Sequence, residues 1–254
     1  MDWSSTLLLA VAGTGAGAIN AIAGGGSLVT FPALLLLGYP PVVANVTNTV
    51  AAFPGYLGGV WGYRRELAGQ GRRILMLGAV TALGAIGGSA LLLLGSERAF
   101  VAAVPWLVLG STLLLAVQPL LVRSRADRAR TPRSERLRWA TLGQLGVATY
   151  GGYFNAGLGI MMLGVLGIAL DEQLQRLNAL KGALSAITSA VSLGCFVIFA
   201  TVSWPAATIM AGAGLFGGWL GARLGRRIPV AVLRWSVVAF GLAISLVLLV
   251  DHAS

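Results

Sequence analysis

The 254-residue sequence has few charged residues, one cysteine and one histidine. Charged residues make up 10% of the chain, against about a quarter in a typical soluble domain, while 57% of it is hydrophobic. A water-soluble fold has too little interior to bury this apolar surface, which excludes a soluble enzyme or binding module. One cysteine excludes a disulfide framework, and one histidine argues against a histidine-rich metal site or a Ser-His-Asp triad. We therefore predict an all-α polytopic membrane protein.

Carboxylates are missing from the middle of the apolar runs. The eight acidic residues all fall in loops or at run ends: Asp2, Glu66, Glu97, Asp127, Glu135, Asp171, Glu172 and Asp251. Proton pumps and cation carriers usually place a carboxylate at membrane depth, and magnesium-dependent phosphoryl chemistry also needs one. The sequence contains no Gly-x-Ser-x-Gly or His-Glu-x-x-His motif. We therefore expect no metal site, no cofactor and no enzymatic activity.

Eight apolar runs organise the chain. They fall at 5–37, 44–62, 74–94, 100–122, 139–170, 181–200, 204–222 and 231–250. Six are close to the ~20 residues that cross a ~30 Å hydrocarbon core. The runs 5–37 and 139–170 are too long for one crossing. Glycine-rich stretches interrupt both, at Gly24–Ser27 and at Gly151–Gly159, and glycine favours sharp turns over helix.

The distribution of basic residues predicts how these two long runs fold. If 139–170 crossed the membrane once, 11 basic residues would face the cytoplasm and 7 would face outside. If it folds back as a hairpin of two short helices, 17 face the cytoplasm and Arg98 alone faces outside. The positive-inside rule favours the hairpin, and by analogy a second one at 5–37, with both termini outside. The arginine-rich linker 123–138 is interpreted as orientation charge at an anionic leaflet, with no nucleic-acid partner.

Residues 1–122 and 139–254 resemble each other and form two membrane repeats joined by 123–138. Three matches occur in the same order: Asn20-Ala21 with Asn155-Ala156, Asn45–Asn48 with Asn178–Lys181, and Gly87-Gly88 with Gly217-Gly218. Each half then contains one broken or hairpin helix and three transmembrane helices, and the odd number of crossings puts the halves in opposite orientations. Inverted repeats of this kind are typical of secondary transporters, whose substrate sites lie near the midplane between the repeats.

The polar residues near the two breaks are neutral or cationic. We predict that eleven residues bind substrate: Asn20, Gly24, Gly25, Gly26, Ser27, Thr47, Asn48, Asn155, Asn178, Lys181 and Ser185. Half-helices that start at Ser27 or Leu158 would point free N–H groups and the positive dipole end into the protein, a favourable setting for an anion. Asn178, Lys181 and Ser185 share one helix face.

Each of these features also has a purely structural interpretation. The glycines could serve close helix packing, and Asn20 and Asn155 could be interhelical hydrogen-bond partners. Lys181 could extend to the membrane interface, and Asn45 and Thr47 could cap a helix.

With these residues in view, the chain resembles the TauE/SafE family of membrane permeases, also called the sulfite exporter family. The segments that carry the resemblance are Asn20–Leu34, Pro40-Pro41, Ala44–Asn48, Leu177–Lys181 and Trp204–Leu224. The likeness covers nearly the whole chain except 123–138. It implies movement of a small sulfur-containing anion, such as sulfite or an organosulfonate, across the cytoplasmic membrane by alternating access. Converging N–H and amide donors with one cation suit such oxyanions.

Three other functions remain to be weighed against a carrier. A passive small-anion channel could use the same glycine-lined centre. An intramembrane lipid-modifying enzyme would need a nucleophile–base pair or metal cluster that the sequence lacks. A scaffold would have no use for the breaks and the repeat. The anion, the direction of transport and the coupling ion are left open by the sequence, as is a homo-oligomer.

Overall fold

The computed structural model describes residues 2–123, 133–224 and 230–253, which form ten α-helices and no strand. The helices of the first half are α1 (Trp3–Ile22), α2 (Ser27–Leu36), α3 (Pro41–Gly62), α4 (Gly71–Leu94) and α5 (Glu97–Arg123). Those of the second half are α6 (Arg133–Tyr153), α7 (Leu158–Ala169), α8 (Leu174–Phe199), α9 (Trp204–Leu224) and α10 (Val230–Ala253). The prediction of an all-α fold is confirmed. Most of the 123–138 linker lies outside the described residues.

Several helices have the length and apolar surface of membrane spans. Within the described residues, α1, α4, α8 and the Glu97–Val117 part of α5 are long and apolar enough to cross a bilayer. Large apolar side chains such as those of Trp3 and Leu94 are 80% and 88% exposed, which suits a surface in contact with lipid. The helices α2 and α7 have only 10 and 12 residues, too few to cross a core of ~30 Å.

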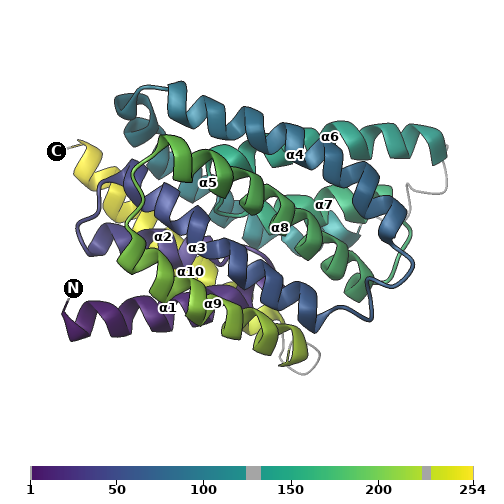
Figure 1. Ribbon diagram of the computed structural model, residues 1–254, viewed down its shortest axis with the longest axis horizontal. Helices are drawn as coiled ribbons and strands as arrows, with labels where there is room; N and C mark the ends of the chain where they lie inside the picture. Colours follow the sequence, from purple (N-terminus) through teal and green to yellow (C-terminus); the bar gives the residue numbers. More distant parts are fainter. Residues whose placement is uncertain (1, 124–132, 225–229, 254) are drawn as a thin grey trace.

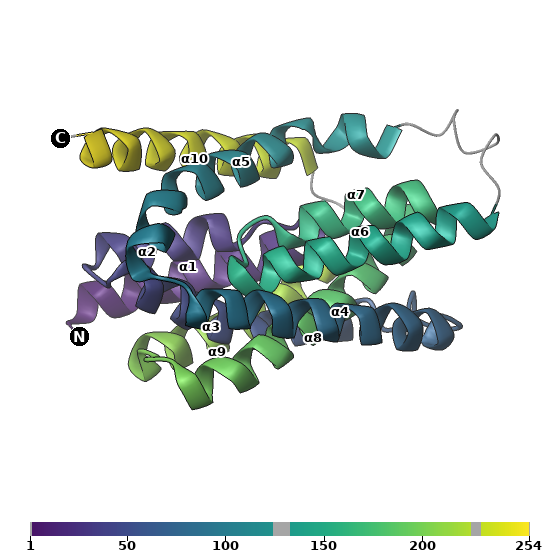
Figure 2. The same cartoon turned by 90° about the horizontal axis from the view of Figure 1, so that it is seen from above.

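The ten helices run along the longest axis of the molecule (Figure 1). Seen from above, α5 and α10 lie side by side on one face, and the short helices lie between this pair and the layer of α3, α4, α8 and α9 (Figure 2). The pair also joins the two halves, because α5 contacts α7 and α10 contacts α2. The interior of the molecule is thus built around the two segments that each contain a short helix.

The same helix contacts are found when each helix of one half is replaced by its counterpart in the other half, α1 by α6, α3 by α8 and α4 by α9. The packing of α1 against α9 has its counterpart in α6 against α4, and α3 against α9 corresponds to α8 against α4. Where α9 packs on α1, a Cβ at Gly217 would collide with the carbonyl oxygen of Thr14. Where α4 packs on α6, a Cβ at Gly88 would collide with the carbonyl oxygen of Thr149. The sequence match paired Gly88 with Gly218, so the structure shifts this match by one residue, to Gly217. These correspondences support the predicted repeat.

The first break is made by two glycines. Gly24 and Gly25 have φ of +82° and +92°, a conformation that L side chains rarely adopt. The N–H groups of Ala23 and Gly24 both donate to the Ile19 carbonyl, which closes the last turn of α1. α2 then starts at Ser27, as predicted, and Gly26 packs directly on the backbone of Ala16. The chain therefore turns back along α1.

The second break is shorter than the sequence predicted. Gly151 and Gly152 belong to α6, where they allow close packing against Leu158 and against α4, so the expectation that they interrupt the helix was wrong. The turn comprises residues 154–157, with Gly157 at a φ of +80°, and α7 starts at Leu158 as predicted. Gly143 faces Val165 and Gly151 faces Leu158, which is the antiparallel pairing of a helical hairpin.

The basic residues gather at one end of the molecule, here called the basic end. It is formed by the α3–α4 loop, the α7–α8 loop and the last turn of α9, and both chain termini lie at the opposite end (Figure 1). At the basic end Arg73 and Arg176 both pair with Glu172, at 2.6 and 3.0 Å. The hydrogen bond from Arg73 and the charges of both arginines hold the pKa of Glu172 below its usual value. This cluster connects α4 of one half to α8 of the other.

Candidate functional site

The two hairpin turns meet in the middle of the protein. Gly24 lies so close to the backbone of Gly159 and Ile160 that a Cβ would be 2.7 Å from both. A Cβ at Gly159 would in turn lie 3.0 Å from the Gly24 Cα and 3.5 Å from the Lys181 Cδ. Both breaks and α8 therefore converge on one point, which no single half could form alone.

Lys181 is the basic residue at this junction. Its side chain is fully buried, and its ammonium donates to the Asn20 carbonyl oxygen at 3.0 Å and to Asn178 Oδ1 at 3.1 Å. In a continuing helix the Gly24 N–H would donate to the Asn20 carbonyl, but here it donates to the Ile19 carbonyl. The Asn20 carbonyl therefore accepts its hydrogen bond from Lys181. Lys181 does not extend to the interface, because α8 starts at Leu174 and carries it two turns inward. Both partners are neutral oxygens, so the charge is not neutralised by them.

A matching bond holds the other hairpin. Asn45 Nδ2 of α3 donates to the carbonyl oxygen of Tyr153, the last residue of α6, at 2.9 Å. Each half thus donates from its third helix to a carbonyl at the end of the other half's first helix. Since α3 starts at Pro41, Asn45 and Thr47 lie within the helix and do not cap it, so that alternative was wrong.

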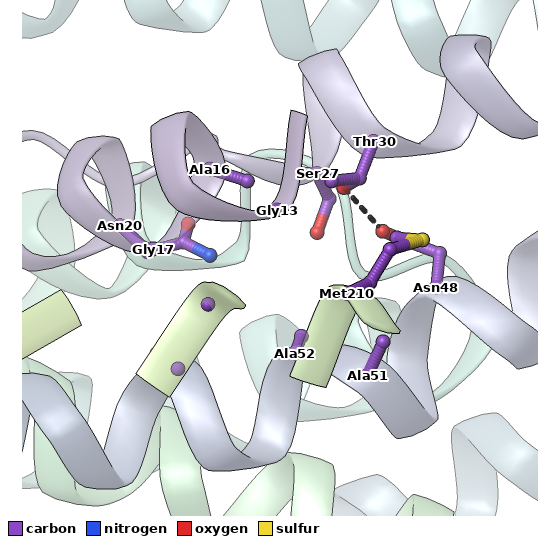
Figure 3. Close-up of a pocket in the computed structure, with 12 residues that line it drawn as sticks. Gly13, Ala16, Gly17, Asn20, Ser27, Thr30, Asn48, Ala51, Ala52 and Met210 are labelled. Atoms are coloured by element: carbon purple, nitrogen blue, oxygen red, sulfur yellow. Dashed lines mark hydrogen bonds between the residues drawn. The ribbon is translucent and has the colours of Figure 1, made fainter. Parts of the chain in front are cut away.

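A small cavity lies beside Asn20, between α1, α2, α3 and α9 (Figure 3). We call it the central cavity. Its polar lining comes from Asn20, Ser27, Thr30 and Asn48, while small residues and Met210 form the remainder. Its volume of about 20 Å³ holds one or two water molecules.

Two hydrogen-bonding groups in this cavity have no protein partner. Thr30 donates to Asn48 Oδ1 at 2.5 Å, which leaves Asn48 Nδ2 buried without an acceptor, and Ser27 Oγ is also unpartnered. Both residues are at most 2% exposed. An unpaired buried polar group costs about 1–3 kcal/mol. The side chains of Asn20, Ser27 and Asn48 converge on the cavity in Figure 3, so these groups are positioned to bind a ligand that accepts hydrogen bonds.

Asn20 connects the central cavity to a second one nearer the basic end. The second cavity, here called the middle cavity, measures about 10 Å³ and is lined by Asn20, Tyr56, Tyr63 and Asn178, among others. Asn20 holds its amide in place by accepting the Gly26 N–H at 2.7 Å through Oδ1. That bond also occupies a backbone donor beside the α2 start, so this terminus offers an anion fewer N–H groups than the sequence suggested.

Three predicted residues line neither the central nor the middle cavity and lie away from the hairpin junction. Thr47 accepts the Ser203 N–H at 3.0 Å and so anchors the α8–α9 loop, and Ser185 donates to the sulfur of Met162 at 3.3 Å. Asn155 accepts from Tyr56 and donates to Ser189, both at 3.4 Å. The structure thus places Asn20, Ser27 and Asn48 at the central cavity and Asn178 at the middle cavity. Gly24–Gly26 and Lys181 lie at the hairpin junction, and the other three residues make separate contacts.

Sequence reasoning missed Thr30 and Met210 as lining residues. Thr30 could have been found, because it follows Ser27 by three positions and shares its helix face. Met210 could not, because it is an apolar residue in an apolar helix of the other half.

The polar side chains at the site are hydrogen-bonding groups without negative charge. Its polar groups are amides and hydroxyls, its nearest charge is the ammonium of Lys181, and no carboxylate lines the central or the middle cavity. The described residues contain no group of three or more His, Cys, Asp or Glu side chains that could hold a metal ion. Such a donor set suits an oxyanion.

The sequence is similar to a known protein family and to several of its relatives. The chain matches the family described as "Sulfite exporter TauE/SafE" over residues 9–248. A "Probable membrane transporter protein" of Haemophilus influenzae is 29% identical over 206 residues, covering 81% of this chain and 79% of that protein. "Probable membrane transporter protein ORF9" of a Sinorhizobium species is 27% identical, covering 93% and 89%, and YfcA of Escherichia coli K12, with the same description, is 29% identical, covering 85% and 77%.

No solved structure matches the chain significantly. The family match covers far more than half of the sequence, and the three relatives are aligned over most of their own length. The chain is therefore a membrane transporter that belongs to the sulfite exporter TauE/SafE family.

Proposed function

We propose that the protein is a carrier for a small sulfur-containing oxyanion, of the sulfite or organosulfonate type, and that the central cavity is its binding site. The observation that carries the proposal is the pair of buried groups without a protein partner, Ser27 Oγ and Asn48 Nδ2. They lie next to the first hairpin, whose Asn20 carbonyl accepts a hydrogen bond from Lys181. A sulfonate or sulfite group presents three oxygens, which accept hydrogen bonds from such donors. The family match supports the substrate class.

The charge balance of the site favours an anion over a cation. Lys181 is buried without a carboxylate among its hydrogen-bond partners, and an isolated buried charge costs several kcal/mol. A bound anion nearby would offset that cost. A metal cation or a proton would instead need the intramembrane carboxylate that the lining residues lack.

The size of the central cavity favours a carrier over a pore. At about 20 Å³ it is too small for sulfite, which has four non-hydrogen atoms, so the surrounding helices must move before an anion can enter. The contacts that recur between the halves support a mechanism in which one inverted repeat rocks against the other around the site.

Transport by the purified protein in liposomes tests this function. We expect labelled sulfite or a small sulfonate to enter with saturable kinetics and to show counterflow, whereas a passive channel would show neither.

Asn48→Asp should reduce the rate by about 100-fold, since it replaces a donor with a negative charge that repels the anion. Thr208→Val changes an exposed hydroxyl on α9 and should transport normally. If Asn48→Asp transported as fast as the wild type, the assignment of the cavity would be wrong.

The orientation of the chain gives a separate prediction. The described arginines of the loops and of the α9 end lie at the basic end, and the termini lie at the other. We therefore propose that the protein sits in the cytoplasmic membrane with both termini outside. Alkaline phosphatase fused to the C-terminus should be active, and green fluorescent protein fused there should be dark. A fluorescent fusion would contradict the hairpin topology.

A further inference from the structure

A third cavity lies at the basic end, in line with the other two. It measures about 210 Å³ and is lined by Gly62, Arg64, Arg65, Ala222 and Arg223. The three cavities follow α3 in order: the central one involves Asn48 to Gly55, the middle one Gly55 to Tyr63, and this one Gly62 to Arg65. They therefore outline a route from the centre of the protein to its basic end.

The helix ends hold the three arginines around this cavity. Gly62 of α3 packs against Ala222 of α9, which brings the two ends into contact. Arg64 donates to the Trp61 carbonyl at 3.2 Å, and the guanidinium of Arg223 lies 4.2 Å from the centre of the Trp219 ring. These contacts position the guanidinium groups of Arg64 and Arg223 without neutralising them.

No carboxylate lines this cavity, and the two ion pairs of Glu172 are made with Arg73 and Arg176, not with the arginines of the cavity. The guanidiniums of Arg64, Arg65 and Arg223 therefore lack a carboxylate partner there. Guanidinium groups bind oxyanions through paired N–H donors, and a cleft lined by one sign of charge concentrates ions of the other sign. At about 210 Å³, unlike the central cavity, it has room for sulfite or a small sulfonate.

We infer that Arg64, Arg65 and Arg223 form an anion-capture site that loads and releases the transported oxyanion at the basic end. The inference rests on the proposed function for the identity of the ligand. These arginines would then do more than orient the protein, since they would set the affinity seen from one face of the membrane. The substrate would pass from them to Asn178 and Asn20 along α3.

Transport measured from each face tests the capture site. Sulfite uptake into inside-out vesicles reports the basic end if the termini are outside, and right-side-out vesicles report the other end. For the triple variant Arg64→Gln/Arg65→Gln/Arg223→Gln we expect KM at the basic end to rise about tenfold, a larger factor than at the opposite end. The increase should shrink in ~0.5 M salt, where charges are screened beyond ~4 Å. Replacing the three arginines with lysine should restore most of the affinity.

Two controls separate this role from orientation and from lipid binding. Arg98→Gln removes an exposed arginine at the end that carries the termini and should leave the KM at the basic end unchanged. The effect of the triple variant should also persist in liposomes of pure phosphatidylcholine. An unchanged KM at the basic end, an equal change at both ends, or an effect that requires anionic lipid would each overturn the capture site.

A labelling experiment tests the site even if none of the anions is transported. Arg65→Cys in a Cys195→Ser background should react about tenfold faster with a sulfonate-bearing methanethiosulfonate than with its trimethylammonium analogue. Adding Arg64→Gln and Arg223→Gln should remove this preference, and methanesulfonate should slow the anionic reagent. Equal rates for both reagents before these changes would overturn the inference. Absence of wild-type transport together with the expected labelling preference would overturn only the proposed function.

Discussion

Replacement of Lys181 with methionine is expected to abolish anion transport while leaving the protein folded. Methionine fills a similar volume but cannot donate to the Asn20 carbonyl or attract an anion to the junction of the two hairpins. Loss of a buried charge and its hydrogen bonds corresponds to about 3 kcal/mol, or a rate or affinity reduced by about 100-fold. Counterflow of labelled sulfite in liposomes measures the effect.

The stability of the same variant distinguishes a functional lysine from a structural one. Removing the charge relieves the cost of burying an unneutralised ammonium, whereas the oxygens of Asn20 and Asn178 lose a donor, at about 1–3 kcal/mol each. These effects oppose each other, so the unfolding temperature without anion should change little. Stabilisation by added sulfite should disappear in the variant. Gln175→Ala, an exposed change earlier in α8, should keep both transport and stabilisation. Full transport by Lys181→Met would exclude the proposed role of this residue.

Replacement of Gly24 with alanine is expected to prevent stable folding. The residue has a φ of +82°, which costs an L residue on the order of 1–3 kcal/mol. The new methyl group would also lie 2.7 Å from the backbone of Gly159 and Ile160, and overpacking costs about 1–3 kcal/mol more. The sum approaches the whole stability of a small domain, about 5 kcal/mol at the lower limit. The yield of monodisperse protein after detergent extraction measures the loss.

Gly38→Ala is the matched control for this prediction. Gly38 has almost the same φ, +80°, but a Cβ there would meet no atom within 4 Å. The variant carries the conformational cost without the collision, so it should be extracted in good yield with a modestly lower unfolding temperature. Similar behaviour of the two variants would mean that the contact between the hairpins does not hold the halves together.

Composition and charge predicted the fold well because the bilayer restricts the choices so strongly. A chain this apolar must satisfy its backbone within helices. The arginine positions favoured a hairpin at 139–170, and the hairpin at 5–37 was predicted by analogy. The starts of the short helices at Ser27 and Leu158 were also correct. Gly151 and Gly152 were misassigned, since glycine permits close packing within a helix as well as a turn between helices, and the residue type alone does not separate these uses.

The site was predicted less completely, for a different reason. Hydropathy placed Lys181 at the edge of an apolar run, where a residue that extends to the interface and a buried one look the same. The helix actually starts at Leu174, and its polar first turn kept this start outside the apolar run. Lys181 therefore lies two turns inside the helix and in the interior of the protein. The separation of Thr47 and Ser185 from Asn48 and the cavity depends on which helix faces each of them. That is decided by contacts between the halves, which leave no local pattern in the sequence.

The reciprocal bonds from Lys181 to the Asn20 carbonyl and from Asn45 to the Tyr153 carbonyl have a consequence for biosynthesis. When the first hairpin leaves the ribosome, the lysine that will satisfy its last turn has not yet been translated. A chain that stops before α8 therefore leaves the Asn20 carbonyl without this donor. Assembly can be completed only late, by the arrival of the second half.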